Sequence, residues 1–455
     1  MLGEKRIKDI GEAILARSSA AQTEVVILAG ENYLTRFANS TIHQNVAEAN
    51  VEVRIRVVVG DLESQGARVG VATTNDLDED ALARTLENAL EIARLQPENP
   101  DFRSLPGPDR PLPDVNAFSE ATAACSPEQR ARGVGEICLM AREAGVVASG
   151  ALTTAVLEVG VINSLGIRAY QPATFADINT VAMSDTSAGY ASSLVPDFRG
   201  LDFEALGREA VEKCLHSQNP KALEPGEYTV ILEPYAVQDL VQMLAYTGFG
   251  ALAYQEGRSF MAGKLGEQVV DDHVSIWDDG LSEDGIPWRF DFEGVPKQRV
   301  ALIEGGVAKG VVYDSYRAGK EKDKHSTGHA LPAPNNMGPF PLNLFFGPGE
   351  STLDEMVSST EKGIYVTRFH YTRPVEPKQV IITGMTRDGT FLIEKGEIAY
   401  PLKNLRFTQG YLAALNGVEM VGRQARLLVG MANLARVSVP AVKLRRFRFT
   451  GATEF

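Results

Sequence analysis

The chain has 455 residues, with 45 lysines and arginines against 59 aspartates and glutamates, which gives a formal net charge of −14. Its length allows two or three domains with a sizeable core, and its hydrophobic fraction of 44% is ordinary for a folded globular protein. The acidic balance disfavours direct binding of nucleic acid, because a sequence-independent grip on phosphates needs a basic face.

Neither a membrane segment nor a disulfide framework is expected. No window approaches the roughly 18 apolar residues that a membrane-spanning helix needs, and the N-terminal segment lacks the continuous apolar core of a signal peptide. The three cysteines, Cys125, Cys138 and Cys214, lie far apart and are odd in number, so they suit neither a disulfide set nor a zinc knuckle. We therefore expect a cytoplasmic protein without membrane contact.

An N-terminal α/β subdomain is predicted at residues 1–96. Residues 7–16 are amphipathic and predict a helix, residues 24–29 suit a short strand, and residues 51–57 alternate strictly between apolar and polar side chains. Asp78, followed by two acidic residues, is typical of a helix start, and the helix pattern continues to residue 93. A proline-rich connector at residues 97–113 then marks the boundary.

A second α/β subdomain is predicted at residues 114–220. Pro127 opens a helix that runs to Ala144, strand patterns follow at 153–161 and 167–170, and another helix is predicted at 203–215. Residues 220–226 are rich in turn-forming side chains and form the next link.

The remaining residues, 226–455, predict a mostly β domain. A strand at 228–232 and a helix at 236–244 open it, and Gly305-Gly306 between two strand patterns predicts a hairpin. A second hairpin is predicted where Asp388-Gly389 separates strands at 380–383 and 391–394. The predicted fold class is therefore α+β, with an N-terminal helix-and-sheet region followed by a mostly β C-terminal domain.

The histidines limit the chemistry that the chain can perform. None of the six is followed by glutamate, so the helical metallopeptidase motif with two imidazoles one turn apart is absent. His325 and His329 are four residues apart, and His370 is a conceivable third ligand. Gly328 and Pro332 predict a loop there, however, and imidazoles on a loop are usually solvated or hydrogen-bonded. We predict no catalytic residue in this chain.

An ordered series of motifs in the C-terminal half resembles the TldD/PmbA family, whose older label is modulator of DNA gyrase. The family's central signature is similar to residues 257–268 and to Asp278-Asp279-Gly280. Further similar stretches are residues 292–296, 301–306, 313–318, 326–330 and 391–401. The resemblance extends more loosely into the N-terminal half, and it implies a TldD/PmbA-like fold.

The resemblance implies a complex of two kinds of subunit that together form a zinc metallopeptidase acting on unfolded or extended peptides. In the TldD branch a helix carries His-Glu-x-x-x-His, and a cysteine near the C-terminus is the third zinc ligand. Residues 242–248 of this chain, Gln-Met-Leu-Ala-Tyr-Thr-Gly, occupy the corresponding place, and no cysteine follows Cys214. The chain thus resembles the TldE/PmbA-like branch, and zinc is expected in a TldD-like partner and not in this chain.

Three functional hypotheses follow. In the first, the chain is the non-catalytic subunit beside a TldD-like catalytic subunit; in the second, it is an independent peptide-binding or regulatory homodimer without hydrolytic activity. The third is a stand-alone metal-dependent peptidase that uses His325, His329 and His370. For contacts to extended peptides we predict Arg368, His370, Tyr371 and Arg373. Strand alternation would place Arg368, His370 and Thr372 on one face, with Phe369, Tyr371 and Arg373 on the other.

Overall fold

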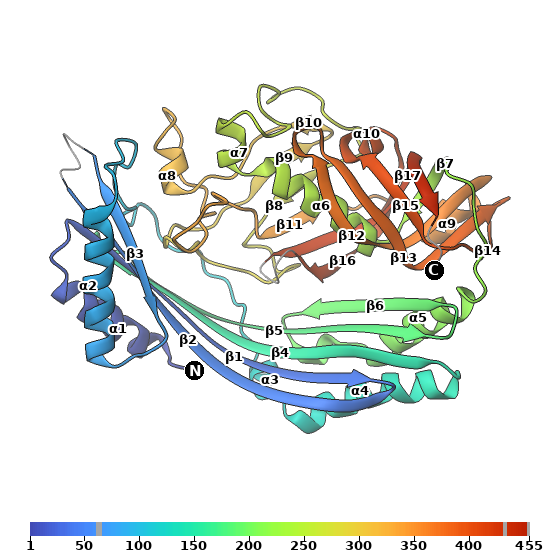
Figure 1. Cartoon of the computed structure of the whole chain (residues 1–455), viewed down its shortest axis with the longest axis horizontal. Helices are drawn as coiled ribbons and strands as arrows, with labels where there is room; N and C mark the ends of the chain where they lie inside the picture. Colours follow the sequence, from blue (N-terminus) through green and yellow to red (C-terminus); the bar gives the residue numbers. More distant parts are fainter. Residues whose placement is uncertain (61–65, 431–434, 453–455) are drawn as a thin grey trace.

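Two β-sheets organise the chain, one from each half of the sequence (Figure 1). The computed structural model describes residues 1–60, 66–430 and 435–452. Within these residues the N-terminal sheet has the strand order β3-β2-β1-β4-β5-β6, and neighbouring strands are antiparallel. Its strands are β1 (Gln22–Ala38), β2 (Thr41–Val59), β3 (Arg68–Thr74), β4 (Val147–Asn163), β5 (Arg168–Met183) and β6 (Ala188–Val195). Strands on both sides of the connector at 97–113 therefore share one sheet.

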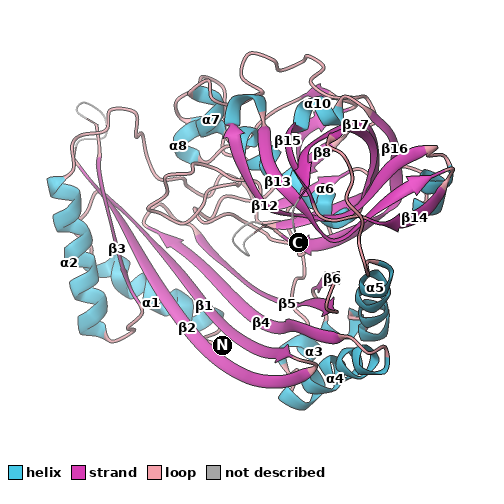
Figure 2. Cartoon of the chain, turned by 45° about the vertical axis from the view of Figure 1, so that its right-hand side comes forward, coloured by secondary structure: helices cyan, strands magenta, loops and turns pink. Residues whose placement is uncertain are grey.

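The N-terminal sheet has one face against helices and one against the C-terminal half. Val25 and Ile27 of β1 join a core with α1 (Glu4–Arg17) and α2 (Glu79–Leu95), whereas Val26 packs with Phe290 from the C-terminal half. Because side chains alternate along a strand, the two partners lie on opposite faces, as Figures 1 and 2 show.

A second group of helices covers the far end of the same face. These helices are α3 (Glu120–Ala123), α4 (Pro127–Glu143) and α5 (Phe203–His216), with a short 3₁₀ turn at Phe198–Gly200. Each edge strand has a glycine where a helix crosses it. A Cβ atom on Gly70 would lie 2.1 Å from the carbonyl oxygen of Ala89, and one on Gly189 would lie 2.1 Å from that of Ala210. Closely packed helices thus cover one face of both edge strands.

The C-terminal half forms a mixed sheet around β17, which pairs with β7, β11, β15 and β16. The helix α6 packs against β12 and β17 over the main hydrophobic core. Its elements are β7 (Gly226–Leu232), α6 (Pro234–Leu244), a π-helical turn (Ala245–Phe249), α7 (Ala251–Gln255), β8 (Ile276–Asp278), β9 (Val300–Glu304), β10 (Val307–Ala308), α8 (Ser315–Ala318), β11 (Asn343–Phe346), α9 (Leu353–Ser358), β12 (Lys362–Glu376), a 3₁₀ turn (Pro377–Gln379), β13 (Ile381–Glu394), β14 (Glu397–Pro401), β15 (Leu405–Gly410), α10 (Tyr411–Leu415), β16 (Val418–Val429) and β17 (Arg436–Ala452).

One of the two predicted hairpins is confirmed and the other is wrong. Gly305 and Gly306 both have positive φ and join β9 to β10 in an antiparallel pair. Asp388 and Gly389 also have positive φ, but they lie inside the continuous strand β13. There the two residues face the single residue Thr367, because Val366 pairs with Thr390 and Arg368 with Arg387. The turn-forming sequence makes a β-bulge, which uses the same backbone conformation without reversing the chain.

The expected α+β fold is confirmed, and the strands are longer than predicted. The predicted strand at 24–29 overlaps the part of β1 that is buried on both faces, residues 22–27, whereas the rest of β1 is mostly half-buried. An apolar run marks only the doubly covered part, so the pattern alone misses the half-exposed extension. Among the described residues, no helix is long and apolar enough to cross a membrane.

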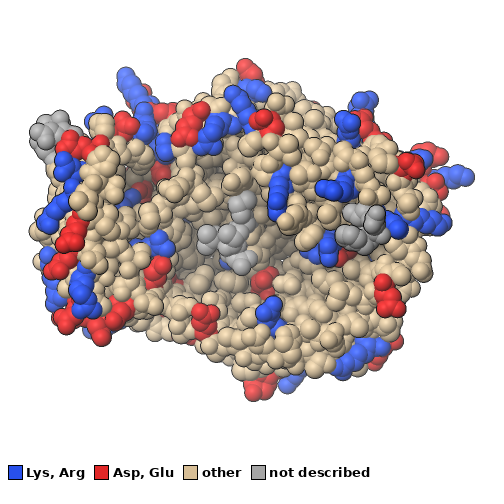
Figure 3. Space-filling model, in the orientation of Figure 1, with Lys and Arg blue, Asp and Glu red and all other residues tan. Residues whose placement is uncertain are grey.

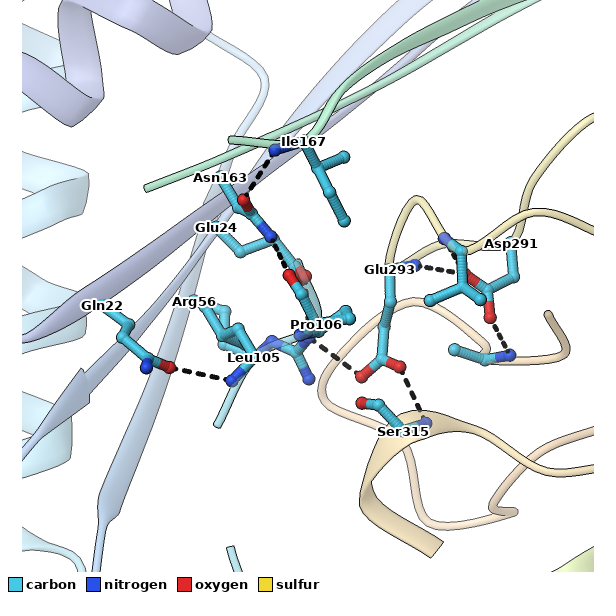
Figure 4. A network of polar contacts seen from close by, with 12 residues as sticks. Gln22, Glu24, Arg56, Leu105, Pro106, Asn163, Ile167, Asp291, Glu293 and Ser315 are labelled. Atoms are coloured by element: carbon cyan, nitrogen blue, oxygen red, sulfur yellow. Dashed lines mark hydrogen bonds and ion pairs between the residues drawn. The ribbon is translucent and has the colours of Figure 1, made fainter. Parts of the chain in front are cut away.

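A buried ion-pair network joins the N-terminal sheet to the C-terminal half (Figure 4). Arg56 of β2 lies 2.7 Å from a carboxylate oxygen of Glu24 on β1 and 3.0 Å from one of Glu293 in the C-terminal half. Glu293 also accepts a hydrogen bond from the backbone N–H of Ser315 at 3.0 Å. Burial raises the pKa of Glu24, and the charge of Arg56 opposes that rise. One guanidinium therefore pairs with carboxylates from both halves of the chain.

The connector at 97–113 is fixed to the N-terminal sheet beside this network. The backbone N–H of Leu105 donates to Oε1 of Gln22 at 2.8 Å, and Nδ2 of Asn163 donates to the carbonyl oxygen of Pro106 at 2.8 Å (Figure 4). The proline-rich segment thus lies along the sheet as an ordered strap.

We expect Arg56→Met to lower the free energy of unfolding by about 3–5 kcal/mol at neutral pH, because it leaves buried carboxylates without their cation. Without Arg56 the pKa of Glu24 rises further above its unfolded value, so protonation stabilises the folded variant. The loss of stability should therefore become smaller as the pH is lowered from neutral towards the ordinary pKa of a glutamate carboxyl. Urea denaturation at several pH values measures both effects. The control Arg68→Met removes an exposed pair with Glu98 and should change stability by less than about 1 kcal/mol. An equal loss of stability in the two variants would contradict the role of Arg56 as a buried ion-pair partner.

Candidate functional site

A cavity of about 540 Å³ lies between the N-terminal sheet and the C-terminal half. This size is within the range of small-molecule sites, and the surface is hollowed between the two halves in the view of Figure 3. Much of the wall is apolar. It includes Leu28, Leu157 and Phe175 from the sheet, and Trp288, Phe292 and Leu342 from the C-terminal half.

Asp177 and Arg436 place opposite charges in the wall of this cavity. Burial raises the pKa of the Asp177 carboxyl to about 6, and the charge of Arg436 opposes the rise. Burial also lowers the pKa of Arg436 to about 10. The guanidinium of Arg436 lies 4.9 Å from the ring centroid of Phe175. At this distance the cation is attracted by the aromatic face.

Lys297 is a second cation in the cavity wall and is only 3% exposed. Among the described residues its Nζ has no hydrogen-bond partner. Burial lowers the pKa of Lys297, while the negative charges of Asp278 and Asp291 oppose the shift. Lys297 could not be predicted from the sequence, because an isolated lysine between a proline and a glutamine carries no local signal of burial.

Asp278, from the motif at 278–280, forms a buried pair with His329. Nε2 of His329 lies 2.7 Å from Oδ1 of Asp278, and Oδ2 accepts the backbone N–H of Asn343 at 2.7 Å. Nδ1 of His329 lies 2.9 Å from Oγ1 of Thr327. This is the order of a hydroxyl–imidazole–carboxylate triad, but His329 is only 1% exposed. The Thr327 hydroxyl is also bonded to the backbone N–H and carbonyl of Tyr313. The arrangement therefore ties motif segments together and leaves no accessible nucleophile.

The structure does not bring His325, His329 and His370 together as a metal site. His325 is exposed on the expected loop, His329 is bound to Asp278, and His370 is half-buried on β12. Within the described ranges, one group of at least three His, Cys, Asp or Glu ligand atoms lies within 4.8 Å of one another, and it is Asp271, Asp272 and His273. The hypothesis of a shared site for the three predicted histidines is wrong for the described residues, because their ring nitrogens do not gather into one group and both nitrogens of His329 are engaged by Thr327 and Asp278.

The four predicted peptide contacts lie on or beside a bulge in β12. Arg368 pairs with Asp388 through Nε at 2.6 Å and lies 4.1 Å from the ring centroid of Tyr190 on β6. Tyr371 is 62% exposed and has a φ of 58°, and the guanidinium of Arg373 lies 4.1 Å from its ring centroid. Burial, followed by the charges of Arg387 and Arg368, lowers the pKa of His370.

The predicted two faces of this strand are wrong. Phe369 packs in the main core, and Thr372 also points inward, where its hydroxyl donates to Asp239 on α6 at 2.6 Å. The register shifts between His370 and Arg373. One extra residue at this bulge reverses the alternation and turns Tyr371 outward.

The segment that corresponds to the zinc-binding helix is helical, as expected, and continues from α6 into the π-helical turn. None of the residues 242–248 has an imidazole or carboxylate side chain, and Tyr246 is half-exposed. The carboxylate of Asp239 accepts hydroxyls from Thr372 and Tyr411, and burial raises its pKa to about 6. This donor set does not fit zinc, which prefers imidazole, thiolate and accessible carboxylate ligands.

Comparisons with known proteins agree with this fold and its motifs. The chain matches domain 1 of the PmbA/TldA metallopeptidases at residues 23–93, their central domain at 113–218 and their C-terminal domain at 225–451. It is 25% identical over 425 residues to the metalloprotease PmbA of Escherichia coli O157:H7, covering 88% of this chain and 87% of that protein.

A metalloprotease of Methanothermobacter thermautotrophicus is 27% identical over 247 residues, so that match spans about half of each chain. The crystal structure of TldE from Thermococcus kodakarensis superposes with a TM-score of 0.86 at 20% identity, covering 98% of this chain and 99% of that one. With three domain models matched in order and the whole fold shared, the chain belongs to the PmbA/TldD metallopeptidase family.

Proposed function

We propose that this chain is the non-catalytic, TldE-like subunit of a TldD-type zinc metallopeptidase that acts on unfolded or extended peptides. The observation that carries the proposal is the chemistry of residues 234–249. Their one carboxylate belongs to Asp239 and is engaged by two hydroxyls. Activation of water by zinc needs ligands and a general base in this place, and these residues supply neither.

The family membership and the fold shared with TldE support the same assignment. A chain that keeps the fold while lacking the zinc ligands can still build the walls of a shared cleft. The TldD-like partner would then hold the zinc and perform hydrolysis.

The bulged segment of β12 is the part of this subunit that we propose to contact the peptide. A left-handed φ at a non-glycine residue is unfavourable, and such conformations concentrate at functional sites. At Tyr371 this backbone displays an exposed ring beside Arg373. An aromatic ring with a neighbouring cation suits the apolar side chains and carbonyl groups of an extended peptide.

We expect the isolated chain to contain no stoichiometric zinc and to cleave no unfolded casein. Co-expressed with a TldD-type chain, it should form a stable complex that contains zinc and cleaves casein. Elemental analysis and a fluorescence cleavage assay measure these properties. In the complex, the double variant His273→Ala, His325→Ala should cleave casein at the wild-type rate, whereas removal of the partner's zinc ligands should abolish cleavage. Stoichiometric zinc in the isolated chain, lost in the double variant, would overturn the proposal.

We expect Tyr371→Gly to leave stability unchanged or raise it by up to about 1 kcal/mol, because glycine adopts a positive φ without strain. The same variant in the complex should raise KM for casein, since the exposed ring is removed. The matched control Val375→Gly replaces another exposed residue of β12, 58% exposed, and should lower stability as glycine does in a strand. If Tyr371→Gly destabilises the protein as much as Val375→Gly, the strain at this position is not real.

A further inference from the structure

Lys297 is a buried cation whose ammonium has neither a counter-ion nor a hydrogen-bond partner among the described residues. Arg56 pairs with Glu24 and Glu293, and Lys213 lies 2.7 Å from Glu209 and 2.6 Å from Glu233. Lys297 forms no ion pair or hydrogen bond from Nζ with any described residue. An ammonium has three donors, and buried charges are normally paired.

The nearest carboxylates are committed to other partners. Asp278 accepts His329 and the backbone N–H of Asn343. Asp291 accepts the backbone N–H groups of Glu293 at 2.9 Å, Val295 at 3.0 Å and Ala330 at 2.8 Å. Both act on Lys297 only through their charge, so the donors of the buried ammonium have no acceptor among the described residues.

Gly280 lies against the aliphatic part of Lys297. A Cβ atom at residue 280 would lie 3.0 Å from Cγ and Cδ of the lysine. A side chain there would crowd the stem and displace the ammonium. The motif Asp278-Asp279-Gly280 therefore supplies both a nearby charge and the space that the lysine occupies.

We propose that Lys297 binds the carboxylate of a ligand whose apolar body fills the cavity between the N-terminal sheet and the C-terminal half. The apolar wall formed by Leu28, Leu157, Phe175 and Trp288 suits a hydrocarbon or apolar side chains. A single negative charge fits better than a phosphate dianion, because Asp177, Asp278 and Asp291 surround the site. The matching chemistry is an apolar monocarboxylate, either a medium-chain fatty acid or the C-terminus of an apolar peptide.

This site lies entirely within one chain, so its test does not require the proposed TldD-like partner. Its failure would leave the proposed function untouched. Isothermal titration of the purified full chain tests it with two acid–amide pairs, decanoate with decanamide and the tripeptide Leu-Phe-Leu with its C-terminal amide. We expect at least one acid to bind about tenfold more tightly than its amide and to change the fluorescence of Trp288. Preference for decanoate identifies a fatty acid, and preference for the tripeptide identifies a peptide C-terminus.

Lys297→Met keeps the length and apolar stem of the side chain and removes its charge. It should weaken binding of the acid about tenfold and leave binding of the amide unchanged. The control Lys309→Met removes an exposed lysine paired with Glu304 and should change neither. If Lys297→Met does not fold, the comparison of acid with amide on the wild-type chain still decides. Equal affinity for acid and amide, no binding of either acid, or wild-type binding of the acid by Lys297→Met would overturn the proposal.

Discussion

The pairing of Arg56 with Glu24 and Glu293 is the contact on which the arrangement of the two halves depends. The N-terminal sheet presents a largely apolar face, and the C-terminal half is built on a separate core. Apolar contact alone does not fix how two such surfaces are oriented, because it is not directional. A buried guanidinium between carboxylates from both sides is directional and costly to break. Together with the pair of Lys213 and Glu233, which also joins the two halves, it holds them in the relative position that leaves the cavity between them.

The functional assignment follows from what this arrangement contains and from what it lacks. The helix at 234–249, which the sequence comparison aligns with the proposed zinc-binding helix of the TldD branch, consists here of residues that pack and bond internally. The motif at 278–280 and His329 are used to hold the C-terminal segments together behind the cavity. The chain therefore keeps the fold of the PmbA/TldD family, and we propose that its polar residues serve binding and assembly.

Much of the fold could be predicted from the sequence, because amphipathic periodicity and helix-start residues are local signals. The helix from Pro127 is an example, since Ser126 and Gln129 form a complete capping box at its start. The bulge at Asp388 could not be predicted, because the same residues and the same backbone conformation serve a turn or a bulge. Which one forms depends on the pairing of β12 with β13, which is not local.

The site was less predictable than the fold for a similar reason. The lack of a His-Glu-x-x-x-His motif could be seen directly in the sequence. Asp177, Lys297 and Arg436 are distant in sequence and meet only when the sheet and the C-terminal half come together. The inward turn of Thr372 likewise depends on a register shift that strand alternation does not reveal.

The central claim, that this subunit does not hold the catalytic metal, is tested most directly by X-ray diffraction from crystals of the complex with a TldD-type chain. Anomalous difference maps collected on both sides of the zinc absorption edge locate each zinc ion. The account predicts a zinc peak inside the TldD-type subunit and none coordinated by side chains of residues 234–249 of this chain. A zinc peak bound entirely by this chain's own side chains would contradict it.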